Sequence, residues 1–397
     1  MITGQLLRRI FDAANMQRWN DHIRPVELVE LDKQAHKMVV AWVLAKFQEE
    51  EDQGPVDWVE LIEGGLFEFL QRITVTDLKP QLFHRIQEDH TKRVALNKWV
   101  YAQIRPLIIS LGESFCQRFQ NYFANPKPSI SRQILQAAHS YATKWEFEIL
   151  ESANPRWFEI GDIRADLQGK QEQSCNLEGM RRLVLYSSIR NFVDLCGHLR
   201  FQIRWSHLHR VPRTSVLGHM LIVAILSYLL SLEVNACNKR CTNNYFTGLF
   251  HDLPEVLTRD IVNPVKHSVE GLDELIKEYE KNEMERRVYK LLPSSWLPDM
   301  KMFTRREFST RVSVDGKRLV TTTAEIGASF NSDEFNPRDG GLVKAMDTLS
   351  AFVEAHLAIE NGLTSGEFAR ARESILEENG DTVIGGIDIG RIYREFL

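Results

Sequence analysis

The sequence repeats itself across its two halves, and this repeat limits what the chain can fold into. The tripeptide Gly-Leu-Phe occurs twice, ending at Phe67 and at Phe250, and each copy continues into a polar residue, Glu68 or His251. A histidine in a helical pattern precedes each polar residue by 32 positions: His36 before Glu68, and His219 before His251. Matched order and spacing over such a distance predict two copies of one structural unit.

Further pairs of short segments follow the same order in both halves. They are Arg18-Trp19 with Arg204-Trp205, Thr76-Asp77 with Arg259-Asp260, and Ala137-Ala138-His139 with Ala345-Met346-Asp347. In the last pair, a glutamate follows seven residues later, Glu146 in one half and Glu354 in the other. We therefore expect a tandem duplication, with one domain over residues 1–178 and the other over 179–397.

Apolar residues recur at intervals of three and four through most of the chain, which predicts an all-α fold built from helical bundles. The clearest helical segments are 33–47, 96–112, 131–151, 215–232 and 342–361. One hairpin is predicted at 311–323, around the turn signal Asp315-Gly316. It lies in an insertion of the second copy, at about 292–341, which is rich in loop-forming residues. The polar segment 153–177 is the best candidate for a linker.

The composition is that of a folded protein with a sizeable core: 43% of the residues are hydrophobic and 26% are charged. A net charge of −5 gives no strong signal for nucleic-acid binding. Five cysteines without a C-x-x-C pair argue against a disulfide framework and favour a reducing cytoplasm. The apolar run 220–232 is shorter than a bilayer span requires, so no membrane association is expected.

The repeated positions of the second half carry residues that suit a metal ion. His219, the pair His251-Asp252, and Asp347 supply imidazoles and carboxylates from three separate helical segments. These are the ligand types of a borderline or hard divalent cation, and helices of one bundle can direct them into a shared interior. Any one of these residues alone is more often a structural or surface residue, so the prediction rests on the set.

The second half also resembles the HD-domain metal-dependent phosphohydrolases, and among them the bacterial 5'-deoxynucleotidases. The resemblance covers 201–292 and 344–354. Its motifs in this sequence are Arg204-Trp205, the run from Arg213 to His219, the run from His251 to Asp260, Asn263-Pro264-Val265-Lys266, and Ala345-Met346-Asp347.

This resemblance implies that His219, His251, Asp252 and Asp347 bind one divalent ion, such as Co, Mn, Mg or Zn. Glu255 and Asp260 are then expected beside the attacking water or the phosphate. We assign Glu255 to orienting the nucleophilic water, and Asp260 to the acid or orienting role.

Three further residues are expected to bind a nucleotide substrate. Arg204 resembles the family's phosphate-binding arginine, and a guanidinium suits a dianionic monophosphate. Trp205 resembles the aromatic residue placed against the sugar, where its bulk can exclude a 2'-hydroxyl. Lys266 can add a positive charge near the phosphate, and His267 departs from the family pattern as a further potential metal ligand.

The first half has lost these residues. Glu68, Phe69, Arg72 and His139 stand where the second half has His251, Asp252, Glu255 and Asp347. We therefore expect the first half to bind no catalytic metal and to act as a packing partner, which makes the chain a monomeric pseudo-dimer or a homo-oligomer. An alternative is that Arg18, Trp19 and Arg72 form a metal-free nucleotide-sensing pocket.

The leading functional hypothesis is a 5'-nucleotidase that removes phosphate from (deoxy)nucleoside 5'-monophosphates. A dNTP triphosphohydrolase or a phosphodiesterase is the alternative within enzymes. A non-catalytic nucleotide-sensing module is the alternative outside them.

Overall fold

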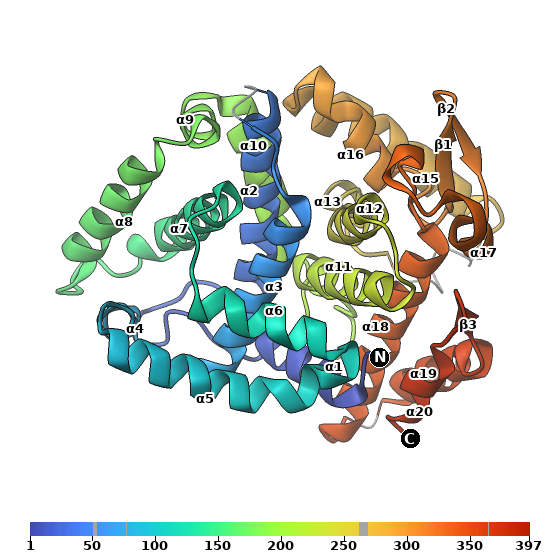
Figure 1. Cartoon of the computed structure of the whole chain (residues 1–397), viewed down its shortest axis with the longest axis horizontal. Coiled ribbons are helices and arrows are strands. Elements are labelled where there is room, and N and C mark those ends of the chain that lie inside the picture. Colours follow the sequence, from blue (N-terminus) through green and yellow to red (C-terminus); the bar gives the residue numbers. More distant parts are fainter. Residues whose placement is uncertain (51–53, 77, 262–268, 364) are drawn as a thin grey trace.

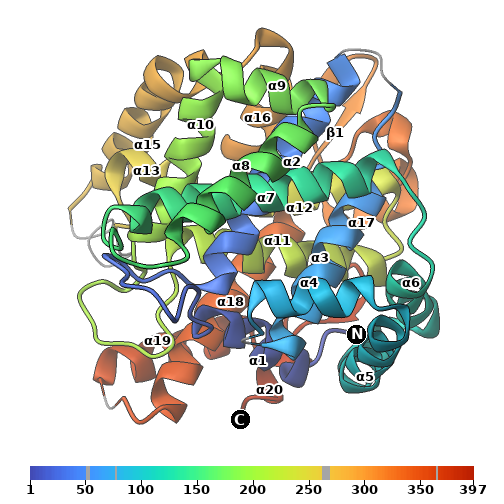
Figure 2. The same cartoon turned by 90° about the vertical axis from the view of Figure 1, so that its left-hand side faces the viewer.

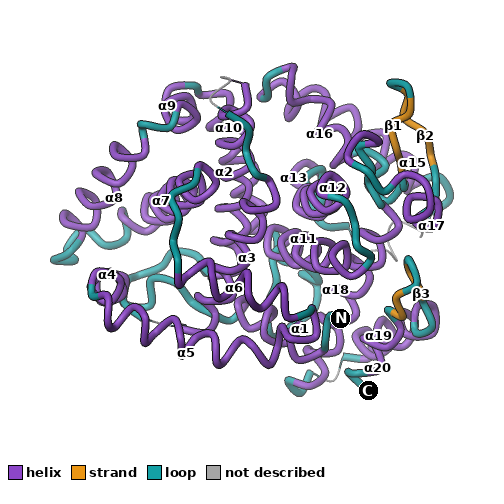
Figure 3. Tube along the Cα trace, viewed as in Figure 1, coloured by secondary structure: helices purple, strands orange, loops and turns teal. Residues whose placement is uncertain are grey.

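The computed structural model confirms the all-α fold, with helices forming nearly all of the molecule (Figure 3). It describes the whole chain except residues 51–53, 77, 262–268 and 364. In the described part, the strands form two small hairpins, β1–β2 and β3–β4. All five cysteines are free thiols.

The helices of the N-terminal half surround the long helices α2 and α7 (Figure 1). Their bounds are α1 Gly4–Phe11, α2 Glu30–Glu50, α3 Trp58–Val75, α4 Pro80–Glu88, α5 His90–Ile108, α6 Glu113–Ala124, α7 Ile130–Glu151, α8 Ile160–Ser174 and α9 Glu178–Leu185.

The C-terminal half is arranged around α11, which packs against α12 and α18. Its elements are α10 Ser187–His198, α11 Val216–Glu233, α12 Asn238–Phe250, α13 Glu255–Thr258, α15 Leu272–Glu283, α16 Leu297–Thr304, β1 Arg311–Val314, β2 Lys317–Val320, α17 Thr323–Glu325, α18 Gly340–Glu360, α19 Gly366–Asn379, β3 Val383–Ile384, β4 Ile387–Asp388 and α20 Gly390–Arg394.

The five helices predicted from periodicity are confirmed as α2, α5, α7, α11 and α18. The predicted hairpin is also confirmed, because β1 and β2 pair antiparallel with Val314 opposite Lys317. Its two turn residues have positive φ, 50° at Asp315 and 74° at Gly316, as a tight two-residue hairpin turn requires.

Two expectations about irregular segments are wrong. Residues 153–177 are not a linker, because they contain the 15-residue helix α8. Its buried Ile160 and Leu167 pack beneath α7 with Phe147 and Leu150. The insertion at 292–341 is not mainly loop either, since it begins with α16, whose Met300 and Phe303 are buried in the main core.

One main core joins the two halves, and α11 lies in it. By length and composition, α11 is the one helix of the described residues that could cross a membrane, but 89% of it is buried inside the protein. The two ends of the chain are also in contact. The backbone N–H of Gly4 donates to the Glu395 side chain (2.6 Å), so the N-terminal and C-terminal segments lie close together (Figures 1 and 2).

Several local contacts occur in the same form in both halves. Isolated antiparallel bridges join Gln17 to Val29 and Ile203 to Ser215, each across twelve residues and directly before α2 or α11. Trp19 and Trp205 both have positive φ, 58° and 57°. Their indole N–H groups donate to Glu146 (3.1 Å) and Glu354 (2.9 Å) respectively.

These bridges also set the structural register between α2 and α11. Counted from its start, the fourth residue of α11 is His219 and the fourth residue of α2 is Lys33. His36, which the sequence spacing matched to His219, instead contacts the carbonyl of Val193 and the ring of Trp145. The sequence pairing was counted back from the Gly-Leu-Phe tripeptides, which follow these helices in the chain. Because α2 has 21 residues and α11 has 18, that pairing is displaced by three residues at the helix starts.

The two halves meet where the starts of α2 and α11 touch. The Ser215 hydroxyl, which caps α11 by accepting from the Gly218 N–H, donates to the buried Asp32 carboxylate (2.6 Å). A Cβ on Gly218 would lie 2.9 Å from Asp32 Oδ1 and 2.9 Å from Leu31 Cδ2, so a larger residue here would have to displace these side chains. Asp32 and Gly218 are each the third residue of their helix, and equivalent positions meet in this way at a two-fold-like interface.

Asp32 makes this contact sensitive to pH. Burial raises the pKa of Asp32 to about 6; Arg200 and the Ser215 hydrogen bond oppose the shift, while Glu146 and Glu27 add to it. Because the folded-state pKa lies above the unfolded value, the neutral acid is the favoured folded form. The neutral Asp32 therefore stabilises the folded state at low pH, and this stabilisation is lost as the pH rises through about 6.

We therefore predict that Asp32→Asn, which cannot ionise, raises the free energy of unfolding above pH 6 by up to about 2–3 kcal/mol relative to the natural protein. The difference should disappear near pH 4. Urea unfolding at several pH values measures it, with the exposed Asp162→Asn as the control. A difference between Asp32→Asn and the natural protein that does not change with pH would contradict the assignment.

Candidate metal centre

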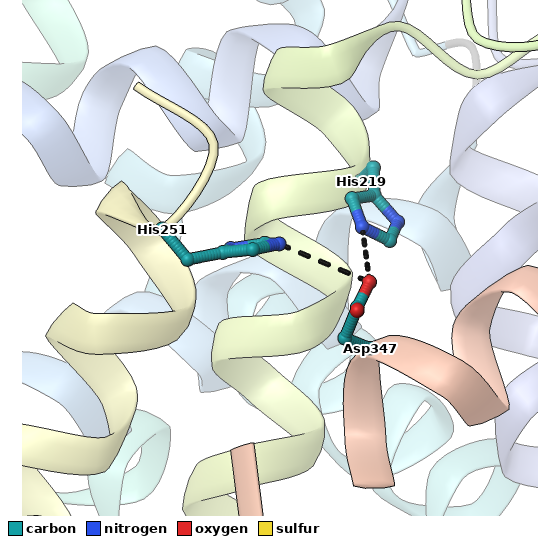
Figure 4. Close-up of side chains that lie close together, drawn as sticks. All are labelled: His219, His251 and Asp347. Atoms are coloured by element: carbon teal, nitrogen blue, oxygen red, sulfur yellow. Dashed lines mark hydrogen bonds and ion pairs between the residues drawn. The ribbon is translucent and has the colours of Figure 1, made fainter. Parts of the chain in front are cut away.

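Three of the four predicted metal ligands, His219, His251 and Asp347, come together in the C-terminal half (Figure 4). His219 lies on α11, His251 and Asp252 follow the end of α12, and Asp347 lies on α18. The helices can approach closely because Gly248 faces α11: a Cβ there would lie 2.7 Å from the backbone of Ala224. This is the glycine of the repeated tripeptide, and it brings the end of α12 against α11.

Single ligand atoms of His219, His251 and Asp347 lie within 4.8 Å of one another. Asp347 Oδ1 is 3.1 Å from His219 Nε2 and 3.9 Å from His251 Nε2. Asp252 belongs to the same cluster, with Oδ2 3.2 Å from His251 Nε2 and 3.7 Å from His219 Nε2. The structure thus brings all four predicted ligands to one point.

Neighbouring groups hold the two imidazoles so that both present Nε2 to this point. His251 Nδ1 lies 2.8 Å from the carbonyl oxygen of Gly248, to which it donates. His219 Nδ1 lies 3.2 Å from the Ser350 hydroxyl. Such outer contacts fix ring orientation in metal sites. Asp347 is held similarly, since Lys344 Nζ donates to its Oδ2 (2.9 Å) and leaves Oδ1 toward the histidines.

The electrostatics of the cluster favour a bound cation. Burial lowers the pKa of His251, but Asp252 and Asp347 outweigh it and raise that pKa to about 9. Against the cost of burial, His251 and His219 hold the pKa of Asp252 below its usual range. His251 Nε2 is buried, and its approach to Asp252 lacks hydrogen-bond geometry. An orphaned imidazole nitrogen between two carboxylates fits a divalent ion, which supplies the missing positive charge.

Arg204 and Trp205 lie beside this cluster, and Glu354 on α18 anchors both. Glu354 is fully buried and accepts from Arg204 Nε (3.2 Å), Trp205 Nε1 (2.9 Å) and the Thr214 hydroxyl. Burial disfavours its charge, yet Arg204 and Arg210 lower the pKa of Glu354 to about 2. The other side of the Arg204 guanidinium faces the metal cluster, with Nη1 3.7 Å from Asp252 Oδ2.

Glu255 and Asp260 lie near Arg204. Glu255 is the buried first residue of the short helix α13, three residues after Asp252. Burial opposes the charge of Arg204, but Glu354, Asp260, Asp252 and Glu255 together raise its pKa. Of these four carboxylates, Glu354 and Asp252 contact the guanidinium, at 3.2 and 3.7 Å. Lys266 and His267 lie outside the described residues.

The insertion contributes two residues that sequence reasoning missed. The centre of the Phe308 ring lies 6.0 Å from the centre of the His251 ring. Lys344 Nζ lies over the Phe308 ring, 4.6 Å from its centre. Burial raises the pKa of Glu307, and the charges of His251 and Asp252 both act on it. The insertion therefore lies against the cluster of predicted metal ligands.

Glu354, Ser350 and Lys344 were not predicted as site residues. Their signal was present, because Lys344, Asp347, Ser350 and Glu354 are spaced by three or four residues and so share one face of α18. Glu354 was seen only as part of the repeat.

The corresponding place in the N-terminal half holds different groups. Lys33 takes the position of His219, and its Nζ lies 2.5 Å from His139 Nδ1. Glu68 accepts from Lys37 Nζ and from the Tyr122 hydroxyl (2.7 Å). Phe69 is buried in the core. A lysine is thus the fourth residue of α2, where α11 has the predicted metal ligand His219.

Comparison with known proteins agrees with this geometry. Residues 196–376 match the family model described as an HD domain. A 5'-deoxynucleotidase of Pasteurella multocida (strain Pm70) is 25% identical over 187 residues, which is 46% of this chain and 82% of that protein. A 5'-deoxynucleotidase of Shewanella oneidensis is 26% identical over 187 residues, 46% of this chain and 81% of that protein.

A third relative, a 5'-deoxynucleotidase of Vibrio atlanticus (strain LGP32), is 26% identical over 181 residues, 44% of this chain and 78% of that protein. The three similarities therefore each span less than half of this chain but most of the relative. The C-terminal half of the chain carries an HD domain of the metal-dependent phosphohydrolases, and it is similar to these 5'-deoxynucleotidases.

Proposed function

We propose that the protein is a 5'-nucleotidase that hydrolyses (deoxy)nucleoside 5'-monophosphates to nucleoside and phosphate. The observation that carries this proposal is the placement of Arg204 3.7 Å from Asp252, beside the cluster of two histidines and two aspartates. A phosphate bound by this arginine would sit next to a divalent cation. The similarity to 5'-deoxynucleotidases supports a monophosphate substrate.

In this proposal, His219, His251, Asp252 and Asp347 hold the ion. When bound, it supplies a Lewis acid that polarises the phosphate and activates water near neutral pH. Arg204 binds the phosphate oxygens with the N–H groups that Glu354 leaves free, and stabilises the negative charge that develops during hydrolysis.

Glu255 and Asp260 supply the proton transfers. Glu255, buried beside the ligands, orients the attacking water and takes its proton. Asp260, whose charge acts on Arg204, donates a proton to the leaving 5'-oxygen or orients it. Lys266, which follows closely in the sequence, adds positive charge for the phosphate.

Trp205 selects the sugar. Its ring is held at one end by the hydrogen bond to Glu354 and packs against Phe368 with 5.5 Å between ring centres. A ring fixed in this way next to the phosphate-binding arginine would occupy the space of a 2'-hydroxyl.

We also propose that residues 1–178 are a degenerate copy of the catalytic domain, 179–397. The shared bridges, positive-φ tryptophans and tryptophan–glutamate bonds support common descent. The contact of Asp32 with Ser215 and Gly218 supports an interface derived from a dimer, which would make the chain a monomeric pseudo-dimer. Five free thiols agree with a cytoplasmic location.

The first prediction concerns the reaction. With Mn²⁺, Co²⁺ or Mg²⁺, the purified protein should release inorganic phosphate from dAMP or dTMP. His251→Ala and Asp252→Ala should each reduce kcat/KM at least ~1000-fold, because each removes a metal ligand. His139→Ala makes the matched change in the N-terminal half and should leave the rate within about two-fold.

Phosphate assays and metal analysis of each variant provide the measurement. Release of pyrophosphate or triphosphate from dATP, with dAMP left intact, would favour the triphosphohydrolase instead. Full activity of the His251→Ala and Asp252→Ala variants would rule out the metal-dependent mechanism.

The second prediction concerns sugar selection. Trp205→Ala should raise the ratio of kcat/KM for AMP to that for dAMP by about ten-fold, because the space beside the sugar opens. Trp205→Phe keeps an aromatic ring and should change this ratio less. Steady-state kinetics with the two nucleotides give the ratios, and equal ratios in all three proteins would remove the assigned role of Trp205.

The third prediction concerns Glu354. Glu354→Gln keeps the shape but leaves Arg204 and Arg210 without their buried counter-charge, so it should lower the free energy of unfolding by about 3 kcal/mol. Glu146→Gln, the matched change in the N-terminal half, should destabilise the protein similarly. Only Glu354→Gln should also raise KM for dAMP strongly, since only Glu354 holds the proposed phosphate-binding arginine.

Chemical unfolding and steady-state kinetics of both variants test this pair. If Glu146→Gln raised KM as much as Glu354→Gln, the effect would be one of general stability and not of Arg204 orientation.

A further inference from the structure

The N-terminal half contains a cluster of charged residues at the position that corresponds to the metal centre. Its cationic side chains are Arg18, Lys33, Lys37, Arg72 and, from the other half, Arg200. Its carboxylates are Glu30, Glu68 and Glu146. Asp32, on which Arg200 and Glu146 act, adds a fourth carboxyl group, so the cluster holds five basic and four acidic side chains.

The carboxylates are each shared between several cations. Glu30 accepts from Arg18 Nη1 (2.7 Å) and from Arg72 Nε (3.2 Å). Glu146 accepts from Arg18 Nε (2.7 Å) and from Arg200 Nη1 (3.1 Å). Arg18 thus donates from Nε and Nη1 to two different carboxylates, whereas Arg72 donates to Glu30 from Nε, so the Nη groups of Arg72 can serve a ligand.

Burial and positive neighbours lower the pKa values of two basic groups in the cluster. Desolvation and the charges of Lys33, Lys37, Arg18 and Arg72 hold the pKa of His139 well below its usual range. Burial and the neighbouring Arg18 likewise lower the pKa of Lys33.

A cavity of about 230 Å³ lies against this cluster. It is lined by Asn15, Met16, Gln17, Asn20, Glu30, Arg72 and Thr76. The Arg72 side chain is 27% exposed, so solvent reaches the guanidinium. Apart from Met16 and Glu30, the lining side chains can all donate hydrogen bonds, and the charge of Glu30 is compensated by Arg18 and Arg72.

We propose that this cavity is a metal-independent binding site for a small phosphate-type anion, with Arg72 as its charged ligand and the Asn15 and Asn20 amides at its rim. A planar guanidinium matches two phosphate oxygens, and the carboxylates of this cluster are already paired with arginine or lysine side chains. The volume is below the 300–1,000 Å³ typical of drug-sized ligands, which favours a phosphate group over a whole nucleotide. The proposal does not depend on hydrolysis in the other half.

Calorimetric titration of the full-length protein with inorganic phosphate, at low ionic strength and with a chelator present, tests the site. We expect saturable binding of one phosphate per chain. Titration with dAMP and with deoxyadenosine separates the two sources of phosphate. The nucleoside should not bind, and tighter binding of dAMP than of phosphate would assign the site to the phosphate group of a nucleotide.

Three variants locate the binding. Arg72→Gln removes the charged ligand and should weaken phosphate binding at least ten-fold. Asn15→Asp places a negative charge at the exposed rim with little change of shape and should weaken it at least five-fold, even if Arg72→Gln is poorly folded. Asn125→Asp makes the same change at the exposed end of α6, away from the cavity lining, and should leave the affinity unchanged.

Arg204→Gln distinguishes this site from the metal centre, and it should also leave chelator-resistant phosphate binding unchanged. The proposal is overturned if the chelated protein binds no phosphate. It is equally overturned if binding is lost in Arg204→Gln but retained in both Arg72→Gln and Asn15→Asp.

Discussion

The packing of α11 is the constraint on which the rest of the structure depends. This helix is buried along almost its whole length, against α12 and α18 on one side and α2 on the other. Gly248 and Gly218 permit two of these approaches, since a Cβ at either position would meet the neighbouring helix at under 3 Å. The buried central helix gives His219 its place, the end of α12 brings His251 and Asp252 to it, and Asp347 reaches it from within α18.

Buried charge separates the roles of the two halves. Both halves retain a buried glutamate that holds an arginine and a tryptophan. Around the C-terminal pair, histidines and aspartates leave a negative centre that a cation can fill, whereas the N-terminal pair has the basic side chains of Lys33 and Arg72 nearby. Similar local contacts thus surround two centres that carry different charged side chains.

The sequence allowed the main helices, the hairpin turn and the four clustered ligands to be predicted, because apolar periodicity and residue chemistry are local properties. Helix α8 was missed because few of its residues face the core. The match of His36 to His219 failed because α2 gained three residues, and only the bridges at the helix starts reveal this. The roles of Glu354 and Phe308 depend on contacts across long stretches of chain, which a pattern along the sequence does not record.

The single carboxylate of Glu146 has a consequence for how this protein can change during evolution. It holds Arg18 and Trp19 in the N-terminal half, and Arg200 four residues before Arg204 in the catalytic half. A mutation of Glu146 would therefore disturb both halves at once. Although the N-terminal half lacks the predicted metal ligands, it is not free to drift at this position, because loss of Glu146 would leave buried arginines in both halves without their counter-charge and so destabilise the whole chain.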